Sequence, residues 1–346
     1  MTVCCFTSFT FSYLAKAAVL AASVKRYHPD WVMCAVITDR EPSGYTFDPE
    51  TVPFDEIVWG DELFGSATSA WLFKHDIVEA CTAVKGRALR RLLQQYDKVI
   101  YLDPDVAVFG PMTSIVDGLD EYSTLLTPHQ LDPAVTESSI RDNEFGSLKH
   151  GTFNLGFLAV RSDAEGDRFA EWWEDRLTKF CFSDPVSGLF VDQKWCDLAP
   201  AFFSELGIVR DPGYNVASWN LNRRRVTIDV DGAIKVNGEL LKFYHFTKLG
   251  EVGDTATMRY AGDSFEVFEI WAWYKRAVAS WTDTRIPERW WHYAQYDNGE
   301  RIPQYARELY RNRPDLQRHF PRPFEAAGNS YYAWLQAQGL TSGAAG

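Results

Sequence analysis

The sequence predicts an α/β fold, in which a Rossmann-like, mostly parallel sheet is flanked by helices. Two observations predict it. Short apolar runs alternate with longer segments of helical periodicity through the first half of the chain, as in βαβ units. Two carboxylates, Asp103 and Asp105, directly follow one of these runs, and ligands of open α/β sheets bind at the carboxyl ends of strands.

The alternation is clearest in the first 129 residues. Apolar and β-branched residues predict the strands, and 3.6-residue periodicity predicts the helices between them. In order, the expected elements are a strand at 3–7, a helix over about 11–26, strands at 32–38 and 56–59, a helical segment at 69–95 interrupted at Gly86, a strand at 98–102 and a strand ending at 127–129.

The second half of the chain is more varied. A polar, acidic stretch is expected to form a mobile loop, and short antiparallel strands are expected further on, with Asp-Gly and Asn-Gly hairpin turns. The expected elements are the loop at 130–148, a strand at 151–160, a helix at 163–179 and the antiparallel strands at 226–246. Beyond residue 263 the composition shifts to Trp, Tyr, Arg and Pro among helical pieces. We therefore expect a catalytic domain at 1–262 and a helical, aromatic-rich extension at 263–346.

Composition limits the class of partner and the compartment. The formal net charge of −12 argues against nucleic acid, whose phosphates require clustered cations. The six cysteines are scattered without a C-x-x-C motif, which predicts free thiols in a reducing compartment. The sequence contains no apolar run of about 18 residues and no signal-peptide pattern. We expect a cytoplasmic protein.

Four segments carry residues suited to chemistry. Asp103-Pro104-Asp105 presents hard oxygen ligands that can share a divalent cation. The other three are Asn154-Leu155-Gly156, Asp192-Gln193 and a strand that ends at His245. Each has a structural alternative: a polar turn, an ordinary strand start, a helix N-cap and a core histidine, respectively.

In their order and spacing, these four segments resemble the nucleotide-sugar glycosyltransferases with the GT-A fold. The likeness is greatest to glycosyltransferase family 8 and related bacterial surface-glycan enzymes, and it spans residues 1 to about 250. It implies transfer of a sugar, with UDP-hexose the expected donor and a GDP-linked sugar the alternative. The implied acceptor is a bacterial surface glycan or a lipid-linked glycan.

The resemblance also implies roles for individual residues. Mn²⁺, or Mg²⁺ in its place, would bind the donor diphosphate, and an imidazole ligand favours Mn²⁺. The implied roles are metal ligands for Asp103, Asp105 and His245, phosphate contacts for Lys248 and Lys85, nucleoside contacts for Thr7 and Ser8, and the donor-sugar pocket for Asn154, Asp192 and Gln193.

The stereochemical course is open at this stage. Family 8 enzymes retain the anomeric configuration without a clearly placed nucleophile, and we expect retention here, with Asp192 and Gln193 beside the reacting sugar. In the alternative, Asp192 acts as a general base for inversion. The chain departs from the family at Thr7-Ser8, where an acidic residue usually contacts the base, and after His245, where Thr247 to Glu251 replace Gly-x-x-Lys-Pro-Trp.

Two other functions compete with this prediction. A sugar-phosphate nucleotidyltransferase would need a Gly-rich, basic loop after the first strand, but residues 7–16 offer only Lys16 and no Gly. A non-catalytic carbohydrate-binding or scaffold protein would not need the set Asp103, Asp105 and His245. The Arg and aromatic residues of the tail suit an anionic lipid-linked acceptor or a peripheral contact with the inner face of a membrane, or simply a packed helical bundle.

Overall fold

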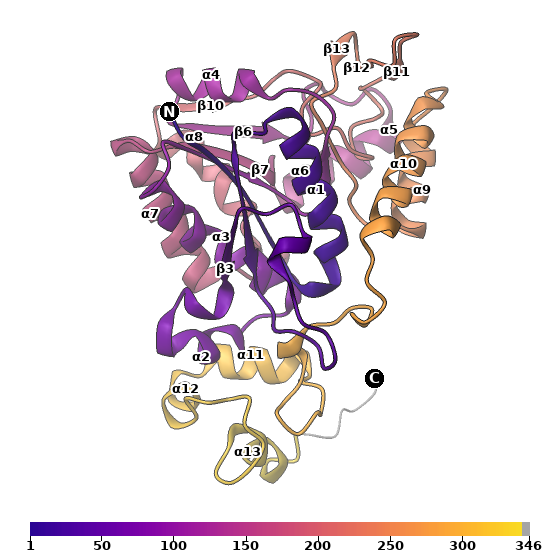
Figure 1. The fold of residues 1–346 in the computed structure, drawn as a ribbon. Helices are drawn as coiled ribbons and strands as arrows, with labels where there is room; N and C mark the ends of the chain where they lie inside the picture. The colour runs from indigo at the N-terminus through magenta and orange to yellow at the C-terminus, as the bar shows by residue number, and fades with distance from the viewer. Residues whose placement is uncertain (341–346) are drawn as a thin grey trace.

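The computed structural model describes residues 1–340 and contains a central seven-stranded sheet (Figure 1). All neighbouring strands are parallel except β7, which runs antiparallel to both β4 and β6. The strands in spatial order are β10 (Leu206–Ile208), β6 (Thr124–Pro128), β7 (Phe153–Arg161), β4 (Lys98–Leu102), β1 (Val3–Phe9), β2 (Val32–Ile37) and β3 (Glu56–Trp59). This topology confirms the predicted α/β class with a mostly parallel sheet.

Short strands and helices surround this sheet. The short strands form three small sheets: β5 (Val106–Val108) with β14 (Phe243–His245), β8 (Ser183–Asp184) with β9 (Leu189–Phe190), and β11 (Val226–Ile228), β12 (Ile234–Val236) and β13 (Glu239–Leu240). The helices are α1 (Leu14–Tyr27), α2 (Thr68–Leu72), α3 (Ile77–Leu93), α4 (Thr113–Glu121), α5 (Glu137–Ser139), α6 (Phe145–His150), α7 (Ala164–Phe180), α8 (Ala199–Phe202), α9 (Glu251–Tyr260), α10 (Glu266–Trp281), α11 (Gln304–Asn312), α12 (Pro314–His319) and α13 (Tyr331–Ala337).

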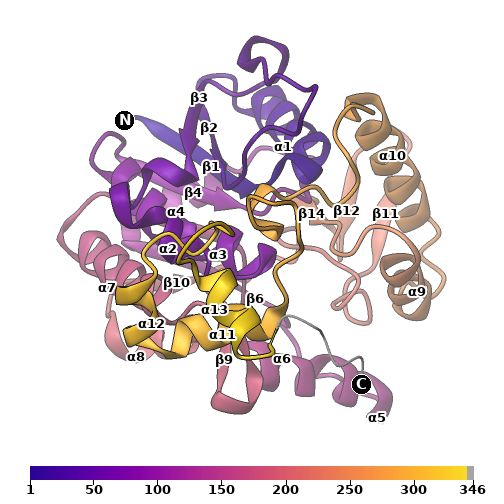
Figure 2. The same ribbon diagram turned by 90° about the horizontal axis from the view of Figure 1, so that it is seen from below.

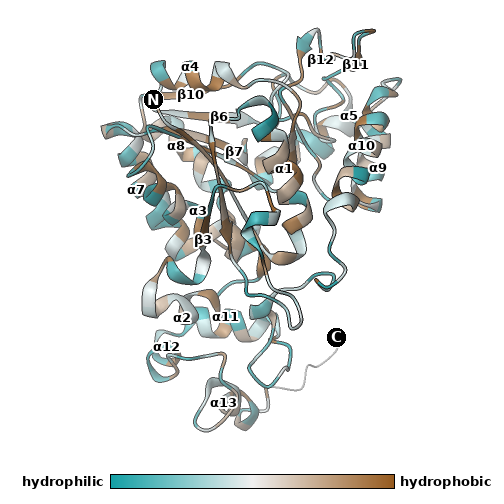
Figure 3. Ribbon diagram, in the orientation of Figure 1, coloured by the Kyte–Doolittle hydropathy of each residue, from teal (hydrophilic) through white to brown (hydrophobic). Residues whose placement is uncertain are grey.

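The sheet is covered by helices on both faces. Helices α3 and α7 bury residues such as Leu89 and Trp173 against one face, and α1 and α4 bury residues such as Leu20 and Ile115 against the other. In Figure 3 the strands between these helices are predominantly hydrophobic, as expected for a sheet buried on both sides. Because β1 is parallel to both β2 and β4, the carboxyl ends of these three strands lie on the same side of the sheet, where ligands of such sheets bind.

The segment predicted as one helix over 69–95 forms two, α2 and α3. The break lies at residues 73–76, where Asp76 begins α3 through a reciprocal capping box with Glu79. Gly86 does not interrupt the helix, contrary to the prediction. A Cβ at this position would lie 2.7 Å from the Cα of Glu174, so the glycine permits close packing of α3 against α7.

The stretch at 130–148 is largely helical, which corrects the prediction of a mobile loop. Helix α5, a π-helical turn (η5, Ile140–Glu144) and α6 follow one another there. Thr136 caps the first of them by accepting a hydrogen bond from the backbone N–H of Ser139. The polar composition of this stretch reflects a helical segment at the surface rather than an unstructured loop.

The predicted group of antiparallel strands at 226–246 is divided between two sheets. Strands β11, β12 and β13 form the expected hairpins, but β14 leaves them and pairs with β5, so that His245 lies opposite Val106. This pairing brings the histidine next to the loop that contains Asp103 and Asp105. Local sequence patterns cannot predict a contact between strands so distant in sequence.

The C-terminal region packs in two places. Helix α10 lies along α1 through a cluster that includes Trp271 and Tyr274, while residues 296–335 form a separate core around Phe73. Figure 2 shows α11, α12 and α13 gathered at the end of the molecule, in front of α2 and α3. The domain boundary at 262/263 remains a prediction.

All six cysteines are free, and five of them are buried, as predicted from their scattered positions. Among residues 1–340, none of the helices has the length and apolar character needed to cross a bilayer.

Candidate active site

Two carboxylates and an imidazole meet at the carboxyl end of β4. Nε2 of His245 lies 3.1 Å from a carboxylate oxygen of Asp105 and 3.6 Å from one of Asp103. One ligand atom from each of the three residues lies within 4.8 Å of the others. Ligands about 2.1 Å from one cation are at most about 4 Å apart, so small side-chain shifts would let all three bind the same ion.

Backbone hydrogen bonds fix the loop that carries the carboxylates. The N–H of Val106 donates to the carbonyl of Asp103 (3.0 Å), which closes a tight turn around Pro104. The N–H of Phe246 donates to the carbonyl of Asp105 (2.8 Å), continuing the β5–β14 ladder. The backbone positions of all three candidate ligands are thus set by one pair of short strands.

Mutual attraction determines the ionisation of His245 and Asp105. Burial lowers the pKa of His245, but the carboxylates of Asp105 and Asp103 outweigh burial and raise it above its ordinary value. Burial raises the pKa of Asp105, but the facing imidazole reverses this and the pKa is lowered. Because a histidine must lose its proton to bind a metal, acid is expected to weaken cation binding here.

Lys85 connects the carboxylate loop to the middle of the sheet. Its Nζ donates to Asp103 (3.1 Å), to Asp192 (2.8 Å) and to the carbonyl of Leu155 (3.2 Å). Burial lowers the pKa of Lys85, but the two carboxylates raise it well above its ordinary value, so the ammonium is charged. An ammonium has three N–H donors, and all three are used. Lys85 therefore positions Asp103 and Asp192 and keeps no donor for a phosphate.

Asp192 is a partner of Lys85 rather than a helix cap. The helical turn that follows, η7 (Lys194–Leu198), has Gln193 as its N-cap residue and no side-chain capping hydrogen bond. Tyr101 also belongs to this cluster, because its hydroxyl donates to Asp103 (2.6 Å). The sequence reading did not select Tyr101, although its position two residues before Asp103 in a strand places both on one face.

The amide side chains predicted to contact the sugar lie in one buried network. The side-chain oxygen of Asn154 accepts from Asn215 (3.0 Å) and from the backbone N–H of Gly156 (3.1 Å), and its amide nitrogen lies 3.3 Å from Gln193 and 3.2 Å from His129. Asn215 and His129 were not predicted. Asn215 adopts a left-handed backbone (φ 53°), which its sequence context does not reveal.

Gly156 leaves room for the ring of His245. A Cβ at position 156 would lie 2.4 Å from Cε1 and 2.7 Å from Nδ1 of His245. Gly156→Ala is therefore expected to displace the imidazole and to lower the free energy of unfolding by about 1–3 kcal/mol. Urea denaturation would measure it. Gly146→Ala is the control, because its Cβ would meet nothing within 4 Å inside α6 and a gain of about 0.5–1 kcal/mol is expected. Equal stability of Gly156→Ala and wild type would contradict this packing.

A cavity of about 880 Å³ adjoins the carboxylate loop. It lies between the ends of β1 and β4, the start of α3 and the C-terminal segment 289–307. Of the predicted residues it is lined by Ser8, Lys85, Asp103 and Asp105. Thr7 is not among them; it is fully buried within β1. Lys248 is exposed in the loop after β14 and does not line the cavity.

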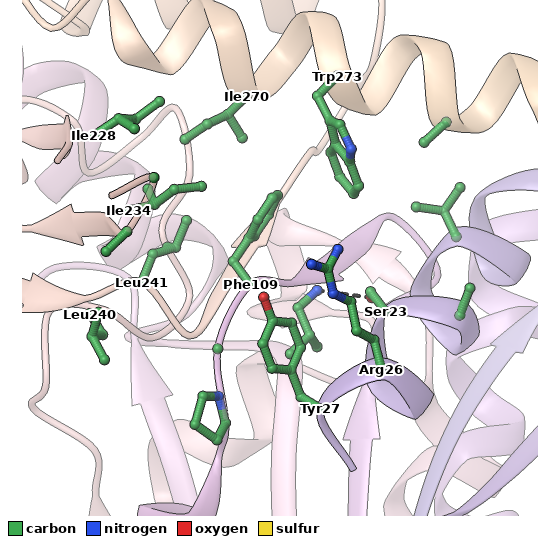
Figure 4. A pocket seen from close by; sticks show the side chains of 18 of the residues that line it. Ser23, Arg26, Tyr27, Phe109, Ile228, Ile234, Leu240, Leu241, Ile270 and Trp273 are labelled. Atoms are coloured by element: carbon green, nitrogen blue, oxygen red, sulfur yellow. Dashed lines mark hydrogen bonds between the residues drawn. The ribbon is translucent and has the colours of Figure 1, made fainter. Parts of the chain in front are cut away.

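A second cavity of about 730 Å³ lies between α1, α10 and the β11–β13 strands. In Figure 4 Phe109, Trp273 and Tyr27 point into it beside Arg26, with Ile234 and Leu241 on the hairpin side. This lining is mostly apolar, and it includes none of the residues that the sequence predicted for the site. The cavity beside Asp103 and Asp105 is therefore the candidate active site.

Comparison with known proteins gives distant similarities. No family model matches the chain. Two uncharacterized proteins of Bacillus subtilis (strain 168), YfnF and YfnD, are each 25% identical to it, over 177 and 174 residues, which is 50% and 49% of this chain and 57% and 53% of the relatives. The chain thus spans about half the length of the curated relatives it matches.

Similar solved structures include several glycosyltransferases. The galactosyltransferase LgtC, solved with donor and acceptor sugar analogs, gives a TM-score of 0.44 at 18% identity, covering 84% of this chain and 99% of LgtC. GlyE of Streptococcus pneumoniae gives 0.44 at 16% identity, covering 80% and 64%. Mouse xyloside xylosyltransferase 1 gives 0.41 at 14% identity, covering 71% and 98%. Because each TM-score is below 0.5, the function proposed next depends on the geometry of the site.

Proposed function

We propose that the protein is a metal-dependent glycosyltransferase that uses a nucleoside diphosphate sugar. The observation that carries this proposal is the meeting of Asp103, Asp105 and His245 at the wall of the 880 Å³ cavity. Two carboxylates and an imidazole suit Mn²⁺ better than Mg²⁺, which prefers oxygen ligands alone. A bound divalent cation would offset the negative charge that develops on the departing diphosphate.

The donor would lie across the carboxylate loop. A cavity of about 880 Å³ is within the usual range for small-molecule and cofactor sites, about 300–1,000 Å³. The nucleoside would pack near Ser8, Tyr13 and Ile77, and the sugar would extend towards Asn154 and Gln193. Lys248, exposed after β14, is free to approach the phosphates. UDP-hexose is the donor that we propose.

Transfer would proceed with retention. Asp192 is the carboxylate that the sequence suggested as a general base, but its oxygen is held 2.8 Å from the Lys85 ammonium and its side chain is only 3% exposed. A buried, ion-paired carboxylate is poorly suited to take a proton from an acceptor that arrives from solvent. The arrangement therefore favours a course in which Asp192 orients the site and does not act as a general base.

The acceptor would approach on the other side of His245. The ring of Trp219 packs edge-on against His245, with 5.2 Å between centroids, and it lines a further cavity of about 500 Å³ beside η5 and α9. Tryptophan offers a flat apolar surface that suits a sugar ring. We propose that a surface-glycan or lipid-linked acceptor occupies this cavity. A peripheral contact of the protein with a membrane would bring a lipid-linked acceptor to it.

A thermal-shift panel tests the proposal. The protein would be heated with UDP, GDP, CDP or dTDP, each with Mn²⁺ and with EDTA. A ligand that binds only the folded state at a hundred times its Kd stabilises it by about 2.7 kcal/mol. We expect one diphosphate to raise the Tm only with Mn²⁺, and the matching nucleotide sugar to be consumed by the enzyme. An unchanged Tm with all four would contradict the proposal.

A further inference from the structure

The C-terminal segment forms one wall of the candidate donor cavity. The cavity lining includes both the carboxylate loop and, from this segment, Arg289, Trp291, Arg301, Ile302 and Gln304. Figure 2 shows the C-terminal elements lying across the end of the molecule where α2 and α3 begin, so this wall comes from the far end of the chain. The resemblance noted in the sequence covers residues 1 to about 250 and assigns no role to this wall.

Buried hydrogen bonds hold this wall in place. The guanidinium of Arg307, which is 3% exposed, donates to the carbonyls of Phe73 (3.2 Å), His75 (2.9 Å) and Tyr293 (2.5 Å). Nε1 of Trp291 donates to the carbonyl of Thr38 (3.2 Å), in the loop after β2. The segment is therefore docked on the α/β core as a fixed part of the cavity.

Two cations on this wall lack a charge partner. Arg289 and Arg301 are exposed, and neither forms an ion pair with a carboxylate anywhere in residues 1–340. Arg311, one turn beyond the buried Arg307, does pair with Glu79. In a protein of net charge −12, two unpaired guanidinium groups in one cavity indicate a site for an anion.

Other positive groups around the cavity are already engaged. Lys85 uses all its donors on Asp103, Asp192 and Leu155. The start of α3 also faces the cavity, but the carboxylates of Asp76 and Glu79 satisfy its capping box and repel an anion. Of the basic residues that line the cavity, Lys85 and Arg307 are engaged in buried hydrogen bonds, and only Arg289 and Arg301 lack such partners among residues 1–340.

We propose that Arg289 and Arg301 bind the phosphates of the nucleoside diphosphate, so that the C-terminal segment completes the donor site. The inference rests on the proposed function. A guanidinium group donates two parallel hydrogen bonds to a phosphate and remains charged at every working pH. The two arginines would hold the diphosphate from the C-terminal wall of the cavity. They would also stabilise the negative charge that the departing diphosphate gains during transfer.

Binding measurements on charge-neutral variants test this inference. The Kd of the nucleoside diphosphate selected by the thermal-shift panel would be measured by calorimetry with Mn²⁺ for wild type, Arg289→Gln, Arg301→Gln and the double variant. Loss of a charged hydrogen bond is expected to weaken binding roughly ten- to a hundredfold in the double variant. Arg318→Gln is the control, since Arg318 is exposed on α12 away from the cavity, and its Kd should match wild type.

The matching nucleoside separates phosphate contacts from pocket shape. Stabilisation by millimolar nucleoside should be the same in the double variant as in wild type. A diphosphate Kd within twofold of wild type in the double variant would overturn the inference and leave the proposed function standing. An equal loss of nucleoside and diphosphate binding would also overturn it, because the arginines would then shape the pocket. Failure of wild type to bind any of the four diphosphates would overturn both.

Discussion

Replacing Asp105 with asparagine is expected to reduce sugar transfer by roughly a thousandfold or more, about 4 kcal/mol in transition-state stabilisation. The change removes one of the two anionic ligands and keeps the shape of the side chain. It also removes the charge partner of His245, whose Nε2 lies 3.1 Å from the Asp105 carboxylate. The remaining pair, Asp103 and His245, would hold a divalent cation weakly.

The fold should survive this substitution. Asp105 lies in a loop whose backbone is fixed by the hydrogen bond from Phe246, which asparagine leaves intact. Two measurements are needed: the transfer rate, and the Tm with and without Mn²⁺ in the presence of the diphosphate. Asp117→Asn, an exposed position on α4, should behave as wild type in both. Metal-dependent transfer by the Asp105→Asn enzyme at an undiminished rate would contradict the proposed site.

Replacing Lys85 with methionine is expected to be the most destabilising change near the site. Lys85 is 2% exposed and its ammonium bridges Asp103 and Asp192. Removing one partner of a buried ion pair leaves an uncompensated charge and costs roughly 3–5 kcal/mol. Urea denaturation should show this loss, whereas Lys179→Met, at an exposed pair with Asp175, should change stability by less than about 1 kcal/mol.

A second substitution separates charge from packing. In the double variant Lys85→Met with Asp192→Asn, one of the two carboxylates left without a cation is neutralised. Part of the lost free energy of unfolding should therefore be recovered. The loss in the double variant is expected to be smaller than the sum of the two single losses. Strict additivity would show that Lys85 contributes through its methylene groups and not through the ion pairs.

Local sequence patterns were sufficient to predict the strands whose carboxyl ends carry the candidate site residues. An apolar run followed by a polar break predicted β4 and the Asp103–Asp105 loop, and the same pattern predicted β1, β2 and β7. These strands are buried on both faces, so their sequences are short, nearly continuous apolar runs, which local pattern alone identifies as strands. The position of His245 at the end of a strand was also predicted, although its partner strand was not.

The remaining features depend on contacts between distant segments. The pairing of β14 with β5 has no local signature, because either strand alone is compatible with several partners. The role of Lys85 required knowing that Asp103, Asp192 and Leu155 surround one side chain. At 130–148 the acidic composition outweighed a helical pattern, and Gly86 was interpreted as a breaker because its neighbour on α7 was unknown. Arg289 and Arg301 gain a role only from the docking of the tail.

The docking of Arg307 has a consequence for the order of assembly. The cavity is bounded by Ser8 and by a wall fixed through Arg307, two segments that lie far apart in the sequence. Contacts of such large sequence separation form late in folding, since the intervening chain must be ordered first. A nascent chain whose residues 289–307 have not yet emerged from the ribosome would therefore already have its sheet and its acidic loop, yet lack a closed cavity. Competence to hold a donor would arise only after this segment has docked.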